Sequence, residues 1–400
     1  MTNITYLIGA GASCGIRDDN ASLPNYSMPF VKEIPARLEL MIYILEQAKE
    51  SVNNSVVDGI KLGKGLQKSY HEVLEELIQK FNIFKENVKS HASIDTYAKK
   101  IYFTDKPNSN GIYEKYEEVK ALIELYFLFE HYFVHHDIRY DLFLASILKG
   151  SQGGNIKLPK SINIISWNYD FQFEASLANF FHTDRLKELR NNFDIYPGRE
   201  KDITPDELDE FKFIHLNGVS GAFYNENQKS RCKSDDILLV KNIGNFNISE
   251  IIKAIEDKNE NIVSEIKNIS RLLLPIINTI IDKYAFYSVQ KKLSSIKFAW
   301  ELEDLRVSPI DYKFPFAKIV LKQTDILVII GYSFPTFNRK IDKMIFKNLG
   351  DYVTIYLQVP DFDYNPIKTK INSLSFSRFS ESINQIDIMN EFFIPYEFVG

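Results

Sequence analysis

Six short apolar runs separated by helical stretches constrain the fold of this 400-residue chain most, and four of them end near a glycine or asparagine turn. The runs are Thr5–Ile8, Ile162–Ser166, Phe211–Asn217, Ser295–Trp300, Ile326–Ile330 and Val353–Val359. Neighbouring parallel strands need crossover connections, which helices between the runs would supply. The sequence therefore predicts an α/β fold with a Rossmann-like, mostly parallel sheet.

The composition narrows the classes of function. The chain has 48 Lys and Arg against 53 Asp and Glu, a formal net charge of -5, which argues against direct nucleic-acid binding. The two cysteines, Cys14 and Cys232, are too few for a four-cysteine zinc ribbon. The N-terminal residues lack the pattern of a signal peptide, and no apolar stretch is long enough to span a bilayer. We expect a cytoplasmic protein that binds no membrane.

The first strand run ends in a glycine turn made of Gly9, Ala10, Gly11, Ala12 and Ser13. Gly9 and Gly11 leave room for a diphosphate to approach backbone N–H groups at a helix start, and Ser13 could add a hydroxyl. A dehydrogenase would have glycine where Cys14 stands and an acidic residue ending a strand about 20 residues further on. Glu33 is near that distance but not at a strand end. The alternative is a tight turn without a ligand.

Asn168 and Asp170 follow the second strand run, and the neighbouring Trp167 and Tyr169 are aromatic. An amide near a sugar can hold a water or a ribose hydroxyl, and a nearby acid can orient it. The alternative is that Asn168 caps the helix that follows, which is a favoured role for asparagine.

His215 and Asn217 are two residues apart on a predicted strand, so their side chains are expected on the same face. His215 could act as a base near neutral pH. The alternative is a packed histidine whose ring nitrogens are satisfied within the core.

No metal site is expected. His131 and His135 have the i, i+4 spacing that can hold a metal on a helix. However, no third ligand is identifiable, and the aromatic residues around them indicate a packing role.

Four segments, taken together and in order, resemble the sirtuin-like family, in the form seen in bacterial antiviral NAD-degrading proteins. Gly9–Ser13 resembles the GAG(I/A)S phosphate turn, Ser166–Asp170 is similar to the T-x-N-(I/Y)-D catalytic turn, His215–Ser220 resembles the H-G-S strand end, and Ile330–Pro335 resembles the GYS-x-P turn. This resemblance implies NAD⁺ as the substrate, with no metal.

The resemblance also implies roles for single residues. The diphosphate would lie on Gly9, Ala10, Gly11, Ala12 and Ser13. Asn168 would orient the nicotinamide ribose and the attacking water, and Asp170 would support that site. Gly331 and Ser333 would contact the adenosine side.

One departure from the family pattern concerns the base. The family histidine directly precedes the glycine, and here that position is Asn217, which cannot accept a proton as a base. His215 could replace it, from about 6–7 Å further back along the strand. Losing a general base costs roughly 10²–10⁴-fold in rate. The chain could be a slow enzyme, an enzyme rearranged around His215, or a binding subunit.

The function that the resemblance implies is an NAD⁺ glycohydrolase effector of bacterial anti-phage defence, which depletes NAD⁺ by releasing nicotinamide. The absent zinc ribbon favours attack by water over attack by an acyl oxygen. Expected partners are further copies of this chain, a second defence protein such as a HerA-like ATPase, or both. The alternative is a catalytically weak or inactive sirtuin-like subunit that binds a nucleotide or serves as a scaffold. A dinucleotide oxidoreductase is disfavoured because the acidic ribose ligand is missing.

The four motifs also suggest how the chain is organised. We expect a single domain over residues 1–400. Its expected parts are a Rossmann-like core over about 1–37, 156–221 and 292–375, large helical insertions over about 38–150 and 222–290, and a C-terminal tail over 376–400. Residues 90–110 are expected to form a loop, and an aromatic helix over 114–148 is expected to break near His136.

Overall fold

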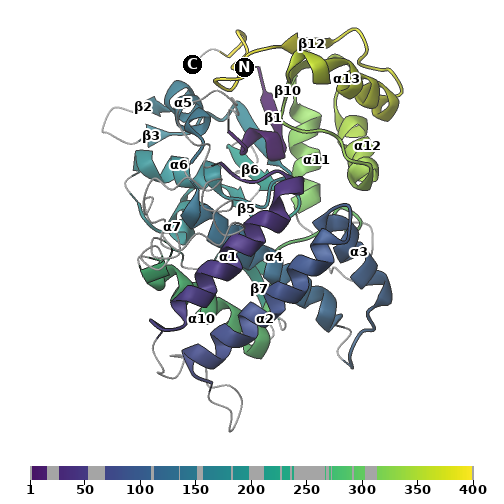
Figure 1. The fold of residues 1–400 in the computed structure, drawn as a ribbon. Coiled ribbons are helices and arrows are strands. Elements are labelled where there is room, and N and C mark those ends of the chain that lie inside the picture. Colours follow the sequence, from purple (N-terminus) through teal and green to yellow (C-terminus); the bar gives the residue numbers. More distant parts are fainter. Residues whose placement is uncertain are drawn as a thin grey trace.

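The structure is a computed structural model, and the part of the chain that it describes forms two lobes (Figure 1). The described residues are 2–15, 27–52, 68–109, 112–134, 136–150, 156–181, 183–197, 211–225, 228–234, 237, 266, 270–271, 273–290, 292–301 and 313–398. One lobe is built around a parallel sheet and is called the α/β lobe. The other consists mainly of α-helices and is called the helical lobe.

A seven-stranded sheet forms the centre of the α/β lobe, and each pair of neighbouring strands is parallel. Its strands, in spatial order, are β12 (Ile383–Ile386), β11 (Thr354–Gln358), β10 (Ile326–Ile330), β1 (Ile4–Ile8), β4 (Ile162–Ser166), β6 (Lys212–His215) and β5 (Ile195–Tyr196). Every residue of the three central strands β10, β1 and β4 is buried. Strands buried on both faces read as continuous apolar runs, which explains the sequence pattern. The predicted α/β fold with large helical insertions is confirmed.

Helices cover both faces of this sheet. Because successive residues of a strand face opposite ways, neighbouring residues of β1 pack in different hydrophobic cores. Tyr6 and Ile8 pack with α5 (Ile138–Ile147) and α6 (Gln172–Phe181). Leu7, between them, packs in the other core with α11 (Lys313–Gln323), α12 (Arg339–Asn348) and α13 (Asp361–Ser375). The short helix α7 (Leu186–Asn192) joins the first of these layers through Leu189.

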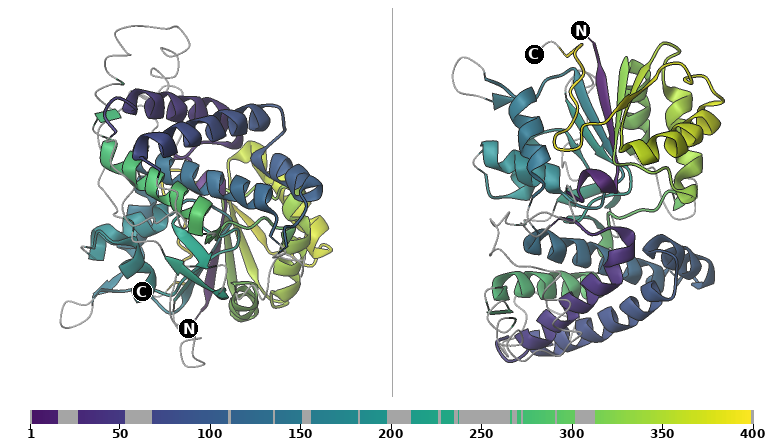
Figure 2. Two further views of the ribbon diagram at one scale, coloured as in Figure 1. Left: turned by 90° about the horizontal axis from the view of Figure 1, so that it is seen from below. Right: turned by 45° about the horizontal axis from the view of Figure 1, so that its top comes forward.

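The helical lobe has a hydrophobic core of its own. Its helices are α1 (Ile34–Ala48), α2 (Tyr70–Lys89), α3 (Ile94–Thr104), α4 (Glu114–Phe133) and α10 (Leu274–Gln290). Phe171, Val219 and Ile296 also pack in this core, although they lie on loops close to the sheet. Figure 2 shows the helical lobe lying beyond one end of the strands.

Two small antiparallel sheets complete the described structure. One has three strands in the order β8 (Gln228–Ser234), β7 (Ala222–Asn225) and β9 (Lys292–Ser294). The other pairs β2 (Lys149–Gly150) with β3 (Ile156–Lys157). Of the predicted helical stretch over 246–290, α10 is described and has Pro275 in its first turn, whereas residues 246–265 lie outside the described residues.

The predicted loop over 90–110 is wrong, because residues 94–104 form α3. Ser93 caps this helix, and its hydroxyl accepts a hydrogen bond from the Thr96 amide at 3.1 Å. Ile94, Tyr97 and Ala98 are buried at helical spacing in the core of the helical lobe. The charged residues between them hid this pattern in the sequence.

The predicted strand over Ser295–Trp300 is also wrong. The nearby strand β9 ends at Ser294 and belongs to the small sheet. The irregular segment after it runs beside the loop that follows β6, where the Lys297 amide donates to the Asn217 carbonyl at 2.8 Å. By contrast, the predicted break near His136 is present, between α4 and α5.

Two predicted boundaries differ from the observed packing. Helix α5, expected in the first insertion, packs against the sheet. Residues 376–400 were expected to form a tail, yet they contain β12, which pairs with β11, and Phe392 and Phe393 pack in the core beneath α5. The side chain of Gln358 anchors this segment, because its oxygen accepts the Phe393 amide at 2.9 Å.

Candidate functional site

The four predicted motif loops start from four neighbouring strands. In the register, Ile8 of β1 pairs with Ile330 of β10 on one side and with Ser166 of β4 on the other, and Ser166 pairs with His215 of β6. The chain builds β4 and β6 on one side of β1, then β10, β11 and β12 on the other. Ligands of such sheets bind at the carboxyl ends of the strands where the order reverses. Here that point is between β1 and β10.

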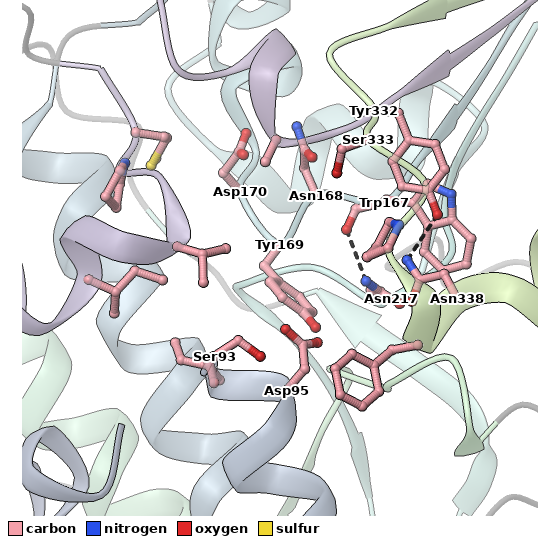
Figure 3. A pocket seen from close by; sticks show the side chains of 18 of the residues that line it. Ser93, Asp95, Trp167, Asn168, Tyr169, Asp170, Asn217, Tyr332, Ser333 and Asn338 are labelled. Atoms are coloured by element: carbon pink, nitrogen blue, oxygen red, sulfur yellow. Dashed lines mark hydrogen bonds between the residues drawn. The ribbon is translucent and has the colours of Figure 1, made fainter. Parts of the chain in front are cut away.

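A cavity of about 440 Å³ lies at these strand ends, within the usual size range of about 300–1,000 Å³ for ligand pockets. The α/β lobe lines it with residues of the four motif loops, including Ala10, Asn168, Asp170, Asn217, Gly331 and Ser333. The helical lobe contributes Ser93, which caps α3, residues 94–96 of α3, Ile34 and Phe127. Figure 3 shows Ser93 and Asp95 across the cavity from Asn168. The site therefore lies between the two lobes.

The glycines of the first and last motif loops allow these loops to pack together. A Cβ on Gly11 would lie 2.8 Å from the Gly331 Cα, and one on Gly9 would lie 2.7 Å from the Tyr332 ring. Gly331 has a φ of +61°, a left-handed conformation that favours glycine. In sequence Gly9 and Gly11 indicated a phosphate turn and Gly331 a contact to the adenosine side; in the structure all three allow the close contact between the two loops.

The amides of the glycine turn are largely engaged within the protein. Gly9 donates to the Ile330 carbonyl at 3.0 Å and Gly11 to the Gly331 carbonyl at 2.9 Å. Ala12 and Ser13 donate back to Gly9 and Ala10 in a short 3₁₀ turn. In this conformation, and among the described residues, the Ala10 amide is left as the candidate contact for a phosphate oxygen. The diphosphate role of all five residues stays a prediction.

Arg139 of α5 braces the same turn from behind. Its guanidinium donates to the carbonyls of Gly11 and Ala12, both at 3.2 Å, and pairs with Asp137 at 2.5 Å. The same Asp137 oxygen accepts the Gly15 amide at 3.0 Å. This buried pair fixes the end of the turn, and the sequence did not indicate it.

Ser13, Asn168 and Asp170 form what we call the cavity cluster. The Asn168 amide group donates to the Ser13 hydroxyl at 3.0 Å, and this hydroxyl donates to an Asp170 oxygen at 3.1 Å. The same Asp170 oxygen accepts the Gln172 amide at 3.2 Å. Burial raises the pKa of Asp170 to about 7, against the opposing effect of these two hydrogen bonds. The cluster joins two predicted motifs and holds a carboxyl group that titrates near neutral pH.

His215 lies outside the cavity. It ends strand β6, and its ring nitrogens lie 3.3 Å from the Asn168 carbonyl oxygen and 3.2 Å from a Glu174 oxygen. Glu174 in turn accepts from Arg190 at 3.2 Å, and Arg190 also donates to the carbonyls of Ser220 and Gly221. Glu174, Arg190 and His215, each at most 1% exposed, are called the sealed network.

The charges of the sealed network are matched to one another. Burial tends to raise the pKa of Glu174, but His215 and Arg190 lower it overall. Both His215 nitrogens lie within hydrogen-bonding distance of protein oxygens, one on the Asn168 backbone and one on Glu174. His215 therefore holds the backbone of Asn168 rather than facing a ligand.

Asn217 faces the cavity, because β6 ends before it and the strand alternation stops. The expectation that His215 and Asn217 share a face is therefore wrong. The Asn217 amide group donates to the Trp167 carbonyl at 3.1 Å, while its side-chain oxygen has no partner among the described residues. The indole N–H of Trp167 is likewise buried without a described acceptor. Unpaired buried polar atoms are costly, so these two favour a polar occupant of the cavity.

An aromatic wall closes one side of the cavity. The rings of Trp167 and Tyr332 are stacked, with centroids 5.6 Å apart and planes at 15°. Tyr332 donates to Asp342 at 2.9 Å and accepts from Asn338 at 3.0 Å, which fixes its ring. These aromatic side chains were visible in the motifs, but their sequence pattern pointed to no role.

Asp95 is a candidate residue that the sequence did not indicate, because it lies in the segment expected to be a loop. It sits in the first turn of α3, is half-buried and lines the cavity. Burial raises the pKa of Asp95 to about 6. Figure 3 shows its carboxylate and the Tyr169 hydroxyl pointing toward each other. Asp95 and Asp170 are the charged side chains on the described cavity wall.

Two further features are absent from the described residues. They contain no group of three or more His, Cys, Asp or Glu side chains placed to hold a metal ion. None of the helices in this part of the chain combines the length and apolar character needed to cross a membrane.

The chain was also compared with known proteins. Neither a protein-family model nor a curated protein sequence matches it. The resemblance of its four motif loops to the sirtuin-like family therefore stays a prediction.

Proposed function

We propose that this protein is an NAD⁺ glycohydrolase, which uses water to release nicotinamide from NAD⁺. The observation that carries the proposal is the meeting of four motif loops, far apart in sequence, around one cavity at the sheet's switch point. A dinucleotide is long enough to contact several strand ends at once. The resemblance of the same four loops to NAD-degrading proteins supports the same ligand.

The charge of the cavity wall supports this chemistry. As nicotinamide leaves, the ribose becomes positively charged, and carboxylates facing it would stabilise that charge. Asp95 and Asp170 are the charged residues among the described lining residues. The side chain of Asn168, already held by Ser13, would orient the ribose and the attacking water.

The biological role in the proposal comes from the family resemblance. We propose a cytoplasmic effector of anti-phage defence that depletes NAD⁺ and acts as a homo-oligomer, with a second defence protein such as a HerA-like ATPase, or both. Assembly would hold the activity in check until infection.

Nicotinamide release from NAD⁺ tests the activity. The purified protein, alone and with candidate partners, is incubated with NAD⁺ and the products are separated by chromatography. Asn168→Ala should lower turnover by about 10²–10³-fold, because a preorganised group that acts on the reacting centre is lost. Asn365→Ala, the same change at an exposed site on α13, should leave turnover unchanged. The absence of nicotinamide release in every condition, including phage-challenged cells, would reject the proposal.

A second candidate function is a nucleotide-binding or scaffold subunit without turnover. Asn217 favours it, because this residue stands where the family pattern has its histidine and His215 is sealed behind the loop. This candidate predicts NAD⁺ binding without nicotinamide release, and cellular protection that Asn168→Ala does not change.

A further inference from the structure

We propose that Asp95, supplied by the helical lobe, is the general base that activates water for the proposed NAD⁺ hydrolysis. This inference rests on the proposed function and assigns a role to an insertion that the sequence left unexplained. On the cavity wall, Asn217 occupies the position at which the family pattern has its histidine base.

Few groups on the described cavity wall can accept a proton near neutral pH. Burial raises the pKa of both Tyr169 and Tyr332 well above its usual value, so these hydroxyls stay neutral. His215 does not line the cavity and is engaged by Glu174 and the Asn168 carbonyl. Asp95 and Asp170 remain.

Asp170 is the less suitable of the two carboxyl groups. It is 7% exposed, and one of its oxygens already accepts hydrogen bonds from Ser13 and Gln172. Its pKa of about 7 leaves much of it protonated at neutral pH. Its contacts suit a group that holds Ser13, and through Ser13 the Asn168 side chain.

Asp95 is more open to the cavity and is held at a fixed place. Ser93 caps α3 two residues before Asp95. Ile94, Tyr97 and Ala98 anchor the helix in the core of the helical lobe. The Asp95 carboxylate thus faces the Asn168 loop from the opposite wall (Figure 3). A water held between the two walls would have the ribose on one side and this carboxylate on the other.

The step is a simple displacement. The water oxygen forms a bond to the anomeric carbon of the ribose, and the bond from that carbon to the nicotinamide nitrogen breaks, with its electron pair going to the nitrogen. The Asp95 carboxylate takes one proton from the water and later releases it to solvent. The products are nicotinamide and ADP-ribose, and no redox partner is needed.

The surroundings of Asp95 set the expected pH dependence. From the loop after β4, the Tyr169 hydroxyl points toward it, whereas the Tyr332 hydroxyl is engaged by Asp342 and Asn338. On α3 itself, Lys99 lies one turn further along, over the rings of Trp300 and Phe337 at 5.3 and 5.4 Å. Because the pKa of Asp95 is about 6, its base form prevails at neutral pH, and kcat should fall as the pH drops through about 6.

The test compares the full-length wild type with Asp95→Asn. We expect kcat for NAD⁺ hydrolysis to fall by about 10²–10⁴-fold, with the Kd for NAD⁺ nearly unchanged and the acidic limb of the pH profile lost. Asp387→Asn, the same change at an exposed site after β12, is the matched control and should behave as wild type. Asp95→Glu keeps a carboxylate and should recover part of the rate together with the acidic limb.

Rescue of the Asp95→Asn variant by azide distinguishes a general base from a residue that only stabilises the fold. Azide attacks the anomeric carbon without giving up a proton, so adding it should restore nicotinamide release by Asp95→Asn, with ADP-ribosyl azide as the product. Wild-type kcat and pH profile in Asp95→Asn would overturn the role of Asp95 and leave the proposed function standing. A loss of activity in Asp95→Asn that neither azide nor Asp95→Glu restores would overturn that role as well. A wild type that binds NAD⁺ but never releases nicotinamide would instead overturn the proposed function, and this inference with it.

Discussion

The cavity cluster and the sealed network meet at one residue but differ in almost every other respect. The Asn168 side chain bonds to Ser13 in the cavity cluster, whereas the Asn168 carbonyl lies against His215 of the sealed network. Asn168 and Asp170 line a cavity. Glu174, Arg190 and His215 do not line it, and both Arg190 and His215 lie within hydrogen-bonding distance of a Glu174 oxygen.

This difference shows how to separate a structural ionic group from a functional one. A base must reach a ligand, and the sequence can show only that a histidine lies close to a motif. The structure shows that the His215 ring turns toward Glu174, while Asn217 and Trp167 keep polar atoms without described partners on the cavity wall. We therefore expect changes in the sealed network to affect stability and changes in the cavity cluster to affect function.

Arg190→Ala should give the largest effect on stability. It leaves Glu174 buried without its guanidinium partner and removes the donors to the Ser220 and Gly221 carbonyls. Breaking a buried ion pair in this way costs about 3–5 kcal/mol of the free energy of unfolding, measurable by urea denaturation. Arg185→Ala, which breaks an exposed pair with Glu188, should cost less than about 1 kcal/mol. Equal losses in the two variants would show that the sealed network does not stabilise the fold more than an exposed ion pair does.

His215→Gln should have a smaller effect on stability and little effect on chemistry. The loss of its two buried contacts should lower the free energy of unfolding by about 1–3 kcal/mol. Turnover per folded molecule should stay within a few-fold of wild type, because the ring does not line the cavity. His71→Gln on α2 serves as the control. A fall in kcat of about 100-fold or more with NAD⁺ binding intact would restore His215 as the base.

Asp170→Asn should change how stability depends on pH. Burial raises the pKa of Asp170 from 3.8 to about 7, so between these values the folded state holds the proton more tightly than the unfolded state. The stabilisation from this group is complete below about pH 4 and is lost as the pH rises to about 7. The variant cannot ionise, so its free energy of unfolding should fall less than that of wild type between about pH 4 and pH 7. Asp387→Asn should keep the wild-type slope, and an unchanged slope in Asp170→Asn would contradict the buried environment described.

The sheet could be predicted because its central strands have a clear sequence pattern. Ile326–Ile330 and Ile4–Ile8 are short apolar runs, and each is buried throughout. A loop follows each strand directly, so the predicted motifs necessarily lie at the same edge of a parallel sheet. Six of the predicted site residues line the cavity for this reason, namely Ala10, Asn168, Asp170, Asn217, Gly331 and Ser333.

The rest of the site depends on contacts that have no local signal. Because β6 ends at His215, Asn217 and not His215 faces the cavity. Strand ends predicted from sequence are uncertain by about two to four residues, so this two-residue difference could not be predicted. Asp95 lies on a helix whose apolar spacing is interrupted by charges. Even with α3 recognised, nothing in the sequence would have placed an insertion helix against the strand ends. The lobe interface is a product of tertiary packing.

A crystal structure of the protein with NAD⁺, obtained with the Asn168→Ala variant to prevent turnover, would test the proposed site. We expect the nicotinamide ribose between Asp95 and the loop at position 168, Asn217 facing the ligand, and His215 still paired with Glu174. A dinucleotide bound away from this cavity, or a His215 ring turned out of the sealed network to meet the ribose, would contradict it.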